Sequence, residues 1–524
     1  MDNAEWIFPA SSQSTDRGQR LLRSAKLPVT LGITFCMLAG TAGSAAALTD
    51  SRSVVHMTGS ANPSPSRATA GSARVSTTVK VVAVSAAAAA AATAAIVTNS
   101  SHQTLSTAHK PRVGASSAIK ALPPAKTSSS AASSSSHAAA VSQTPRVFLV
   151  DAHHLAAQKA AYAAGDPQAA SAVRSLIKRA NKDLAIAPVS VTAKTQIPPS
   201  GDKHDYMSLS IYAWPNPNTA NGLPYIIKDG DKNPSTASIQ DKANLTTVMN
   251  AAQELGYAYY FTGNQTYAAK ASTILQTWFI NPATKMNPNL NYAQAVPGKT
   301  DGGSGGIIDT ADLPKVVDAV GLLAGAKSWS TTDTDQMKTW FASYLTWLRT
   351  SAPGKAEGAT INNHLTWYDA QLVSYALFTG QTAFASSVAK SAETAVIAKQ
   401  IKPDGTQPAE LARATSWSYS TYNVEALVRL SQLASNAHVD LWHYRAPNGA
   451  SIKAAIDYVD SYVTNLSSWP YRQTSKADLH YLPLALSAAA DAYHSGSYQT
   501  LANTAIAASS TLYPAASLVF GPTN

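Results

Sequence analysis

Four residues in the second half of the chain have side chains suited to acid–base chemistry on an anionic substrate. Asn363 and His364 are adjacent and stand where a loop gives way to the apolar run 367–378. Arg413 and Tyr419 lie six residues apart, in a segment that we expect to be irregular and to end just before a helix. A guanidinium or an amide can hold a carboxylate, whereas tyrosine and histidine can transfer protons. The set therefore fits proton transfer beside a carboxylate.

Each of these residues also has a purely structural interpretation. An Asn-His pair at a helix start is often an N-cap beside a hydrogen-bonded core histidine, and for the pair alone this is the better interpretation. Arg413 could instead form an ion pair with Glu410 or Glu425, and Tyr419 could pack at a helix start. The surrounding sequence must decide between the two interpretations.

Four stretches surround these residues in a fixed order along the chain. They are 204–230 with Tyr-Ala-Trp-Pro-Asn-Pro, 286–310 with Asn-Pro-Asn-Leu-Asn-Tyr-Ala-Gln, 362–369 with Asn-Asn-His, and 408–427 with Trp-Ser-Tyr-Ser. Each stretch is weak evidence by itself, but the ordered set resembles the alginate-lyase family of helical-toroid polysaccharide lyases.

The resemblance implies an enzyme that cuts a uronic-acid polymer by β-elimination, either alginate (polymannuronate) or a related polyuronate such as glucuronan. It implies that Asn363 holds the substrate carboxylate and that His364 acts as base or charge neutraliser. Arg413 would act on the carboxylate or on the catalytic tyrosine. Tyr419 would protonate the leaving oxygen, and a second role as base at C5 is open. The product would carry a 4,5-unsaturated uronate at its new non-reducing end.

Three positions depart from the family pattern. The family often has an aromatic residue where Ala213 stands, glycine where Leu365 stands and histidine where Ser418 stands. These changes could alter the sugar subsites and the preferred sugar, but they leave the four catalytic-type residues in place.

Aromatic and amide side chains in the same stretches are candidates for substrate binding, because aromatic faces stack on sugar rings. The candidates are Tyr206, Tyr212, Trp214, Tyr225, Asn291, Tyr292 and Gln294. For two of the four residues in 206–225 we favour packing that pins a long loop to the helices. Asn-Pro turns explain the amides almost as well.

Apolar residues recur at helical spacing from Arg146 onward, which predicts a mainly α domain over 146–524. Together with the resemblance, this indicates an (α/α) toroid, an incomplete α/α barrel. The predicted helices are 152–183, 237–261, 265–280, 310–326, 332–350, 366–379, 382–399, 420–436, 450–465, 484–494 and 498–510. Gly263, Gly380 and Gly496 each follow a similar aromatic-containing segment, so each is expected to end a helix in the left-handed conformation.

The first 145 residues differ in composition from the rest. They carry 12 Lys and Arg against 4 Asp and Glu, whereas the remainder carries 28 against 26, so the net charge of +10 does not mark a nucleic-acid-binding domain. Residues 1–48 have a basic, apolar and then small-residue pattern typical of a signal segment. Residues 49–145 are expected to form a disordered Ala/Ser-rich linker, although a second apolar run, 81–97, leaves the cleavage point and an anchor open. We expect a secreted or periplasmic enzyme without stable membrane insertion in its mature form.

No metal or cofactor motif stands out. The sequence has one cysteine, Cys36, and it lacks a His-Glu-x-x-His pair and an acidic calcium loop. The glycine-rich run 302–306 lacks a following Lys-Ser/Thr and is interpreted as a flexible loop. We therefore expect no cofactor, no metal and no nucleic acid, with an anionic polysaccharide as partner. The alternatives are a glycoside hydrolase on a similar barrel, which needs paired carboxylates, and a non-catalytic glycan-binding protein.

Overall fold

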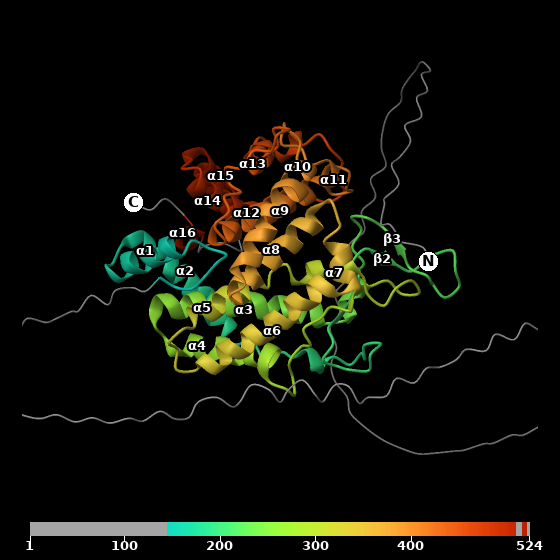
Figure 1. Ribbon diagram of the computed structural model, residues 1–524, viewed down its shortest axis with the longest axis horizontal. Coiled ribbons are helices and arrows are strands. Elements are labelled where there is room, and N and C mark those ends of the chain that lie inside the picture. Colours follow the sequence, from blue (N-terminus) through green and yellow to red (C-terminus); the bar gives the residue numbers. More distant parts are fainter. Residues whose placement is uncertain (1–143, 510–515, 521–524) are drawn as a thin grey trace, which may run out of the picture. The chain divides into compact units, whose positions relative to one another are not determined.

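The computed structural model describes residues 144–509 and 516–520, and helices dominate this part of the chain (Figure 1). The helices are α1 (Ala152–Ala163), α2 (Pro167–Asp183), α3 (Asp241–Thr262), α4 (Gln265–Leu275), α5 (Pro314–Leu322), α6 (Thr331–Thr350), α7 (Ala352–Glu357), α8 (Asn363–Phe378), α9 (Thr382–Ala392), α10 (Ala398–Gln400), α11 (Pro408–Leu411), α12 (Ser416–Asn436), α13 (Ile452–Asp460), α14 (Leu482–Ala492), α15 (Gly496–Ala508) and α16 (Ala516–Val519). The predicted mainly α class is confirmed. The expected signal segment and linker lie outside the described residues, apart from the end of the linker at 144–145.

The long helices follow one another around a ring. In order, α2 packs on α3, α3 on α5, α5 on α8, α8 on α12, and α12 on α14. The short helix α16 contacts both α14 and α2, so it closes the ring. Outer helices α4, α9 and α15 each pair with the inner helix that they adjoin in the sequence. This arrangement is the predicted toroid, and α8 and α12, side by side in Figure 1, form one of its most extensive helix contacts.

Short strands stand beside the helical ring. β1 (Met207–Leu209) pairs in parallel with β4 (Tyr292–Ala295), and β2 (Ala213–Trp214) pairs antiparallel with β3 (Ile226–Ile227). The register shifts between Met207 and Leu209, so the first ladder is irregular. The β1–β4 ladder places two of the family-like stretches, 204–230 and 286–310, against each other.

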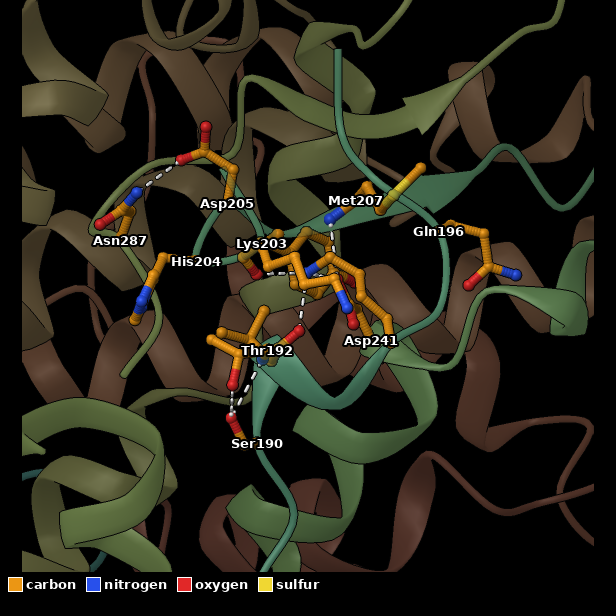
Figure 2. A network of polar contacts seen from close by, with 12 residues as sticks. Ser190, Thr192, Gln196, Lys203, His204, Asp205, Met207, Asp241 and Asn287 are labelled. Carbon is orange, nitrogen blue, oxygen red and sulfur yellow. Dashed lines mark hydrogen bonds and ion pairs between the residues drawn. The ribbon is translucent and has the colours of Figure 1, made fainter. Parts of the chain in front are cut away.

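A buried ion pair fixes the segment that leads into β1. The side chains of Lys194 and Asp241 are almost completely buried, and Lys194 Nζ lies 2.8 Å from Asp241 Oδ2. The same ammonium donates to the carbonyl oxygens of Val191 and Lys203, and the Asp241 carboxylate accepts from the backbone N–H of Met207. Figure 2 shows this network where the start of α3 meets the loop before β1. The loop is therefore attached to the ring by a desolvated ion pair.

Several predicted element boundaries need correction. The range 152–183 contains two helices, because Gly165 at φ +83° and the N-cap Asp166 interrupt it. Gly263 and Gly380 take positive φ as expected, but Gly496 does not. There, His494 takes φ +49° and Gly496 begins α15. Within the described ranges, no helix is long and apolar enough to cross a membrane.

Candidate active site

The Asn-His pair stands at the start of α8. The N-cap is the preceding residue, Asn362, whose side-chain oxygen accepts from the backbone N–H of His364 at 3.1 Å. The backbone N–H and the side-chain amide of Asn363 donate to the two carboxylate oxygens of Glu410, at 2.7 and 2.8 Å. Asn363 is fully buried and its Oδ1 has no hydrogen-bond partner. Thus Asn363 holds Glu410 in this structure, and the substrate-carboxylate contact that the resemblance implies for Asn363 stays a prediction.

His364 is paired with a buried carboxylate. Its Nδ1 lies 2.6 Å from Oε1 of Glu357, which ends helix α7 and is 1% exposed. Burial opposes a charge on His364, but Glu357 and then Glu410 outweigh it and raise the pKa of the imidazole above its usual value. The proton on Nδ1 therefore faces Glu357, and Nε2 remains for a substrate, since the ring is partly exposed.

Arg413 forms an ion pair with Asp229. Its Nε lies 3.1 Å from Asp229 Oδ1, its Nη2 donates to the same carboxylate, and the backbone N–H of Ala414 donates to Oδ2 at 2.8 Å. Burial alone would raise the pKa of Asp229, but the hydrogen bonds from Arg413 and Ala414 bring it below its ordinary value. This pair holds the guanidinium 3.5 Å from the centroid of the Tyr419 ring. Arg413 is thus fixed against the tyrosine, which favours the second of its two expected roles.

Tyr419 lies in the first turn of α12, which begins at Ser416, so the predicted helix start near 420 is too late. The irregular segment expected before the helix contains Arg413 but not Tyr419. Its hydroxyl lies 2.9 Å from the hydroxyl of Tyr212, which precedes β2. Burial raises the pKa of Tyr419 well above its usual value, and the nearby Arg413 charge only partly offsets this. Tyr419 is therefore a neutral phenol with a proton to donate.

The predicted aromatic sugar contacts fall into different environments. Tyr206 is fully buried and donates to Asp309 at 3.0 Å, so its position supports the packing interpretation. Trp214 is half-buried, with the Lys228 ammonium 4.8 Å from its ring centroid. Tyr225 and Tyr212 are also half-buried, and Tyr212 alone of the four is shown in contact with a catalytic candidate.

The predicted amide contacts gather around the strand β4. Gln294 has φ +50°, which is uncommon for a residue other than glycine, and its side-chain amide donates to Asp309 at 2.9 Å. Tyr292 is half-buried in the same strand. Asn291 is exposed and accepts a hydrogen bond from Trp347 at 3.0 Å. Gln294 is thus held in position, whereas Asn291 offers its remaining polar atoms to solvent.

The glycine-rich run 302–306 is packed against β4 and reaches the site. Added side-chain carbons at Gly302 and Gly306 would lie within 2.1 and 2.5 Å of Asn291 and Ala293 atoms, respectively. A carbon added at Gly305 would lie 3.5 Å from the His364 ring. Residues 304–310 form a 3₁₀ helix, so the expectation of a flexible loop gives way to a closely fitted wall beside His364.

The carboxylates that a glycoside hydrolase could use are occupied or buried. Asp229 binds Arg413, Glu410 binds Asn363, and Asp309 accepts from Tyr206, Ser208, Lys242 and Gln294. Burial raises the pKa of Asp369 to about 8. In the part of the chain that the structure describes, no three His, Cys, Asp or Glu side chains are grouped as a metal site.

Sequence reasoning missed the roles of Glu357 and Asp229 and named Glu410 only as a possible partner of Arg413. Glu357 stands seven residues before His364, a spacing with no meaning until the chain reverses between α7 and α8. Asp229 lies 184 residues before Arg413. The short sequence distance between Glu357 and His364 is a signal that the sequence offers, and that distance alone does not identify an ion pair.

Comparisons with known sequences and structures identify the family of the chain. A sequence model of the alginate lyase family matches residues 190–469. The structure is similar to that of an alginate lyase from Bacteroides ovatus, with 35% identity, a TM-score of 0.66 and coverage of 69% of this chain and 96% of that chain. Alginate lyase A1-III from Sphingomonas species A1 is 16% identical, with a TM-score of 0.46 and coverage of 74% and 98%. No curated protein matches the chain. Since the family match spans more than half of the sequence and brackets the site just described, the chain belongs to the alginate lyase family of polysaccharide lyases.

Proposed function

We propose that this polysaccharide lyase cleaves alginate, in particular polymannuronate, or a related polyuronate such as glucuronan, by β-elimination. The observation that carries the proposal is the combination of a neutral tyrosine hydroxyl with a fixed guanidinium and an imidazole paired with a buried carboxylate. Tyr419 supplies the hydroxyl, Arg413 lies against its ring, and His364 is electrostatically coupled to Arg413.

Neutralisation of the substrate carboxylate is the first requirement of the reaction. A uronate C5 proton is barely acidic while the adjacent carboxylate keeps its full negative charge. The raised pKa of His364 favours the imidazolium, which can pair with that carboxylate through Nε2. We therefore assign His364 to charge neutralisation and not to proton abstraction.

Tyr419 is the group proposed to move the proton. Its neutral hydroxyl gives its proton to the glycosidic O4 and recovers a proton from C5. The C5–H and C4–O4 bonds break, while the C4=C5 double bond and the O4–H bond form. The protons balance without a second acid or base. The Tyr212 hydroxyl orients that of Tyr419 through their hydrogen bond.

A substrate panel tests the proposal directly. Polymannuronate, polyguluronate, glucuronan and heparinoids are incubated with the enzyme, and ultraviolet absorbance of the unsaturated product is recorded. Absorbance that grows on a uronate polymer supports β-elimination. Shortening of the polymer without that absorbance would favour a hydrolase, and binding without shortening would favour a glycan-binding protein.

We also propose that the enzyme is exported, to the periplasm or the medium. The proposal rests on the basic, apolar and small-residue pattern of residues 1–48 and on the expected polymeric substrate, which is too large to enter a cell intact. Fractionation of cells expressing the full chain, followed by N-terminal sequencing of the recovered enzyme, tests it. Full-length enzyme retained inside the cell would contradict it.

A further inference from the structure

A surface segment that sequence reasoning left unassigned runs directly beside the catalytic residues. The backbone N–H of Ser416 donates to the carbonyl of Arg472 at 3.1 Å, and the N–H of Thr474 donates to the carbonyl of Ala414 at 2.9 Å. Thr415 and Gln473 form an isolated antiparallel bridge. Residues 472–474 thus lie next to the backbone that carries Arg413 at one end and Tyr419 at the other.

The same segment approaches the acid that holds Arg413. A carbon added at Gly230 would lie 3.1 Å from the Thr474 hydroxyl oxygen, and Gly230 follows Asp229. The charge of Arg472 also contributes to keeping the pKa of Asp229 low, after the stronger effects of Arg413 and Ala414. Arg472 is exposed. It therefore adds positive charge at the edge of the site, where an anionic polymer would pass.

Aromatic rings continue the surface beyond Arg472. The ring of Trp469 lies 5.3 Å from that of Tyr471 and 4.9 Å from that of Tyr462, measured between centroids. Its indole N–H donates to the Ser416 hydroxyl at 2.8 Å, which ties the group to the first residue of α12. Tyr471 is 38% exposed, an unusual exposure for a large ring in this structure. We name Trp469, Tyr471 and Arg472 the aromatic–arginine patch.

We infer that the aromatic–arginine patch is a binding subsite for uronate residues of the polymer chain that lie outside the cleaved bond. The inference rests on the proposed function and extends it to a stretch of surface with no assigned role. Tyr471 offers a partly open ring face to a pyranose, and Arg472 offers a guanidinium to the carboxylate of the same or the next sugar. Continuity with the catalytic backbone and charge complementarity select an anionic sugar chain as the occupant.

Two single variants of the full chain test the subsite, Tyr471→Ala and Arg472→Ala. The kcat and KM of each variant and of the parent are measured on a long polymer and on its trisaccharide. The polymer is polymannuronate, or the best substrate of the panel if that is another polymer. Arg472→Ala removes an exposed ion pair between the guanidinium and a substrate carboxylate, so we expect KM for the polymer to rise roughly two- to fivefold. We expect a similar rise for Tyr471→Ala. We expect KM for the trisaccharide to change much less than KM for the polymer, because the proposed subsite lies outside the cleaved bond. The Arg472 effect should shrink at high salt.

Arg174→Ala is the matched control, since Arg174 is an exposed arginine on α2 with no role in the site. Its KM for the polymer should equal that of the parent. If Tyr471→Ala and Arg472→Ala also keep the parental KM for the polymer, the patch serves packing only and the inference is overturned. A parent enzyme that yields no unsaturated product from any polymer would instead overturn the proposed function, so the two failures are distinguishable.

Discussion

At the residue scale, each cationic group of the site has a dedicated carboxylate. His364 is paired with Glu357, and Arg413 is paired with Asp229. A buried or half-buried charge without a partner is costly, so these acids allow the cations to persist before substrate arrives. They also fix the imidazole tautomer and the guanidinium plane, which places the two cations in advance of the reaction.

The Tyr419→Phe variant separates a catalytic tyrosine from a packing tyrosine. The ring and its contact with Arg413 remain, while the hydroxyl is lost. Loss of a general acid–base group lowers turnover by about 10²–10⁴, whereas loss of one hydrogen bond costs stability on the order of 1 kcal/mol. We expect turnover to fall at least a hundredfold with a nearly unchanged melting temperature.

Tyr422→Phe is the control for this measurement, because Tyr422 lies on the same helix and packs on Trp367. It should keep normal turnover. A Tyr419→Phe enzyme with normal turnover would remove the tyrosine from the mechanism and make His364 the leading acid–base candidate.

The Glu357→Gln variant tests the charge state of His364 through the pH profile. The parent keeps the imidazolium below its raised pKa and loses it as pH rises through that pKa, so kcat/KM should decline on the alkaline side. Glutamine removes the largest influence that raises this pKa, and burial, which lowers it, remains. The alkaline decline should therefore move to lower pH. A profile that moves to higher pH, or stays in place, would contradict the assignment of His364 as charge neutraliser.

The sequence identifies the residue types of the site better than their partners. Motif order singles out Asn363, His364, Arg413 and Tyr419. Their contacts with Glu410, Glu357, Asp229 and Tyr212 depend on tertiary structure. For Tyr206 the sequence leaves sugar binding and packing open, because its burial, which favours packing, cannot be read from the sequence.

At the element scale, the start of α12 shows why a helix boundary was missed. Thr415 provides no side-chain cap, and the serines at 416, 418 and 420 all suit a helix N-terminus, so the sequence does not single out one start. The first backbone N–H groups are instead satisfied from another segment, by the Arg472 carbonyl and by the side-chain oxygen of Gln473. Periodicity located the helix, but a distant segment determined its first turn, and that turn carries Tyr419.

The buried Lys194–Asp241 pair yields a prediction about the loop that leads to β1. The Lys194→Met variant leaves the Asp241 carboxylate buried without its cation. Breaking such a pair costs about 3–5 kcal/mol, so we expect a loss of this order in the free energy of unfolding, measured with urea.

The double variant Lys194→Met with Asp241→Asn provides the control, because asparagine keeps an acceptor for the Met207 N–H but carries no charge. It should recover part of the lost stability. If the double variant is no more stable than Lys194→Met alone, the cost arises from lost packing or from the Val191 and Lys203 carbonyls, not from a stranded charge.

At the scale of the whole molecule, all site contacts reported above lie within residues 204–474 of the helical unit. We therefore expect a chain that begins at Pro145 to fold and to match the kcat and KM of the longer protein. The comparison uses the best substrate of the panel, with the melting temperature as the check on folding. Loss of activity or solubility on removal of residues 1–144 would assign that region a role beyond export and linkage.

Helices of the ring line a partly open cavity of about 280 Å³. Its walls combine apolar side chains, including Leu176, Leu484 and Phe520, with the charged groups of Arg179, Glu254 and Arg429. These residues come from α2, α14, the end of α16, α3 and α12, so the cavity exists only when the ring is closed.

Closure by α16 has a consequence for the order of events during synthesis. Residues 516–520 leave the ribosome after the other described elements of the ring, and their contacts with both α2 and α14 link these two helices. A nascent chain halted before residue 516 would expose Leu176 and Leu484 of the cavity wall to water. Such a chain should bind chaperones and be cleaved by proteases, whereas the same chain extended through Phe520 should become resistant within a single folding step.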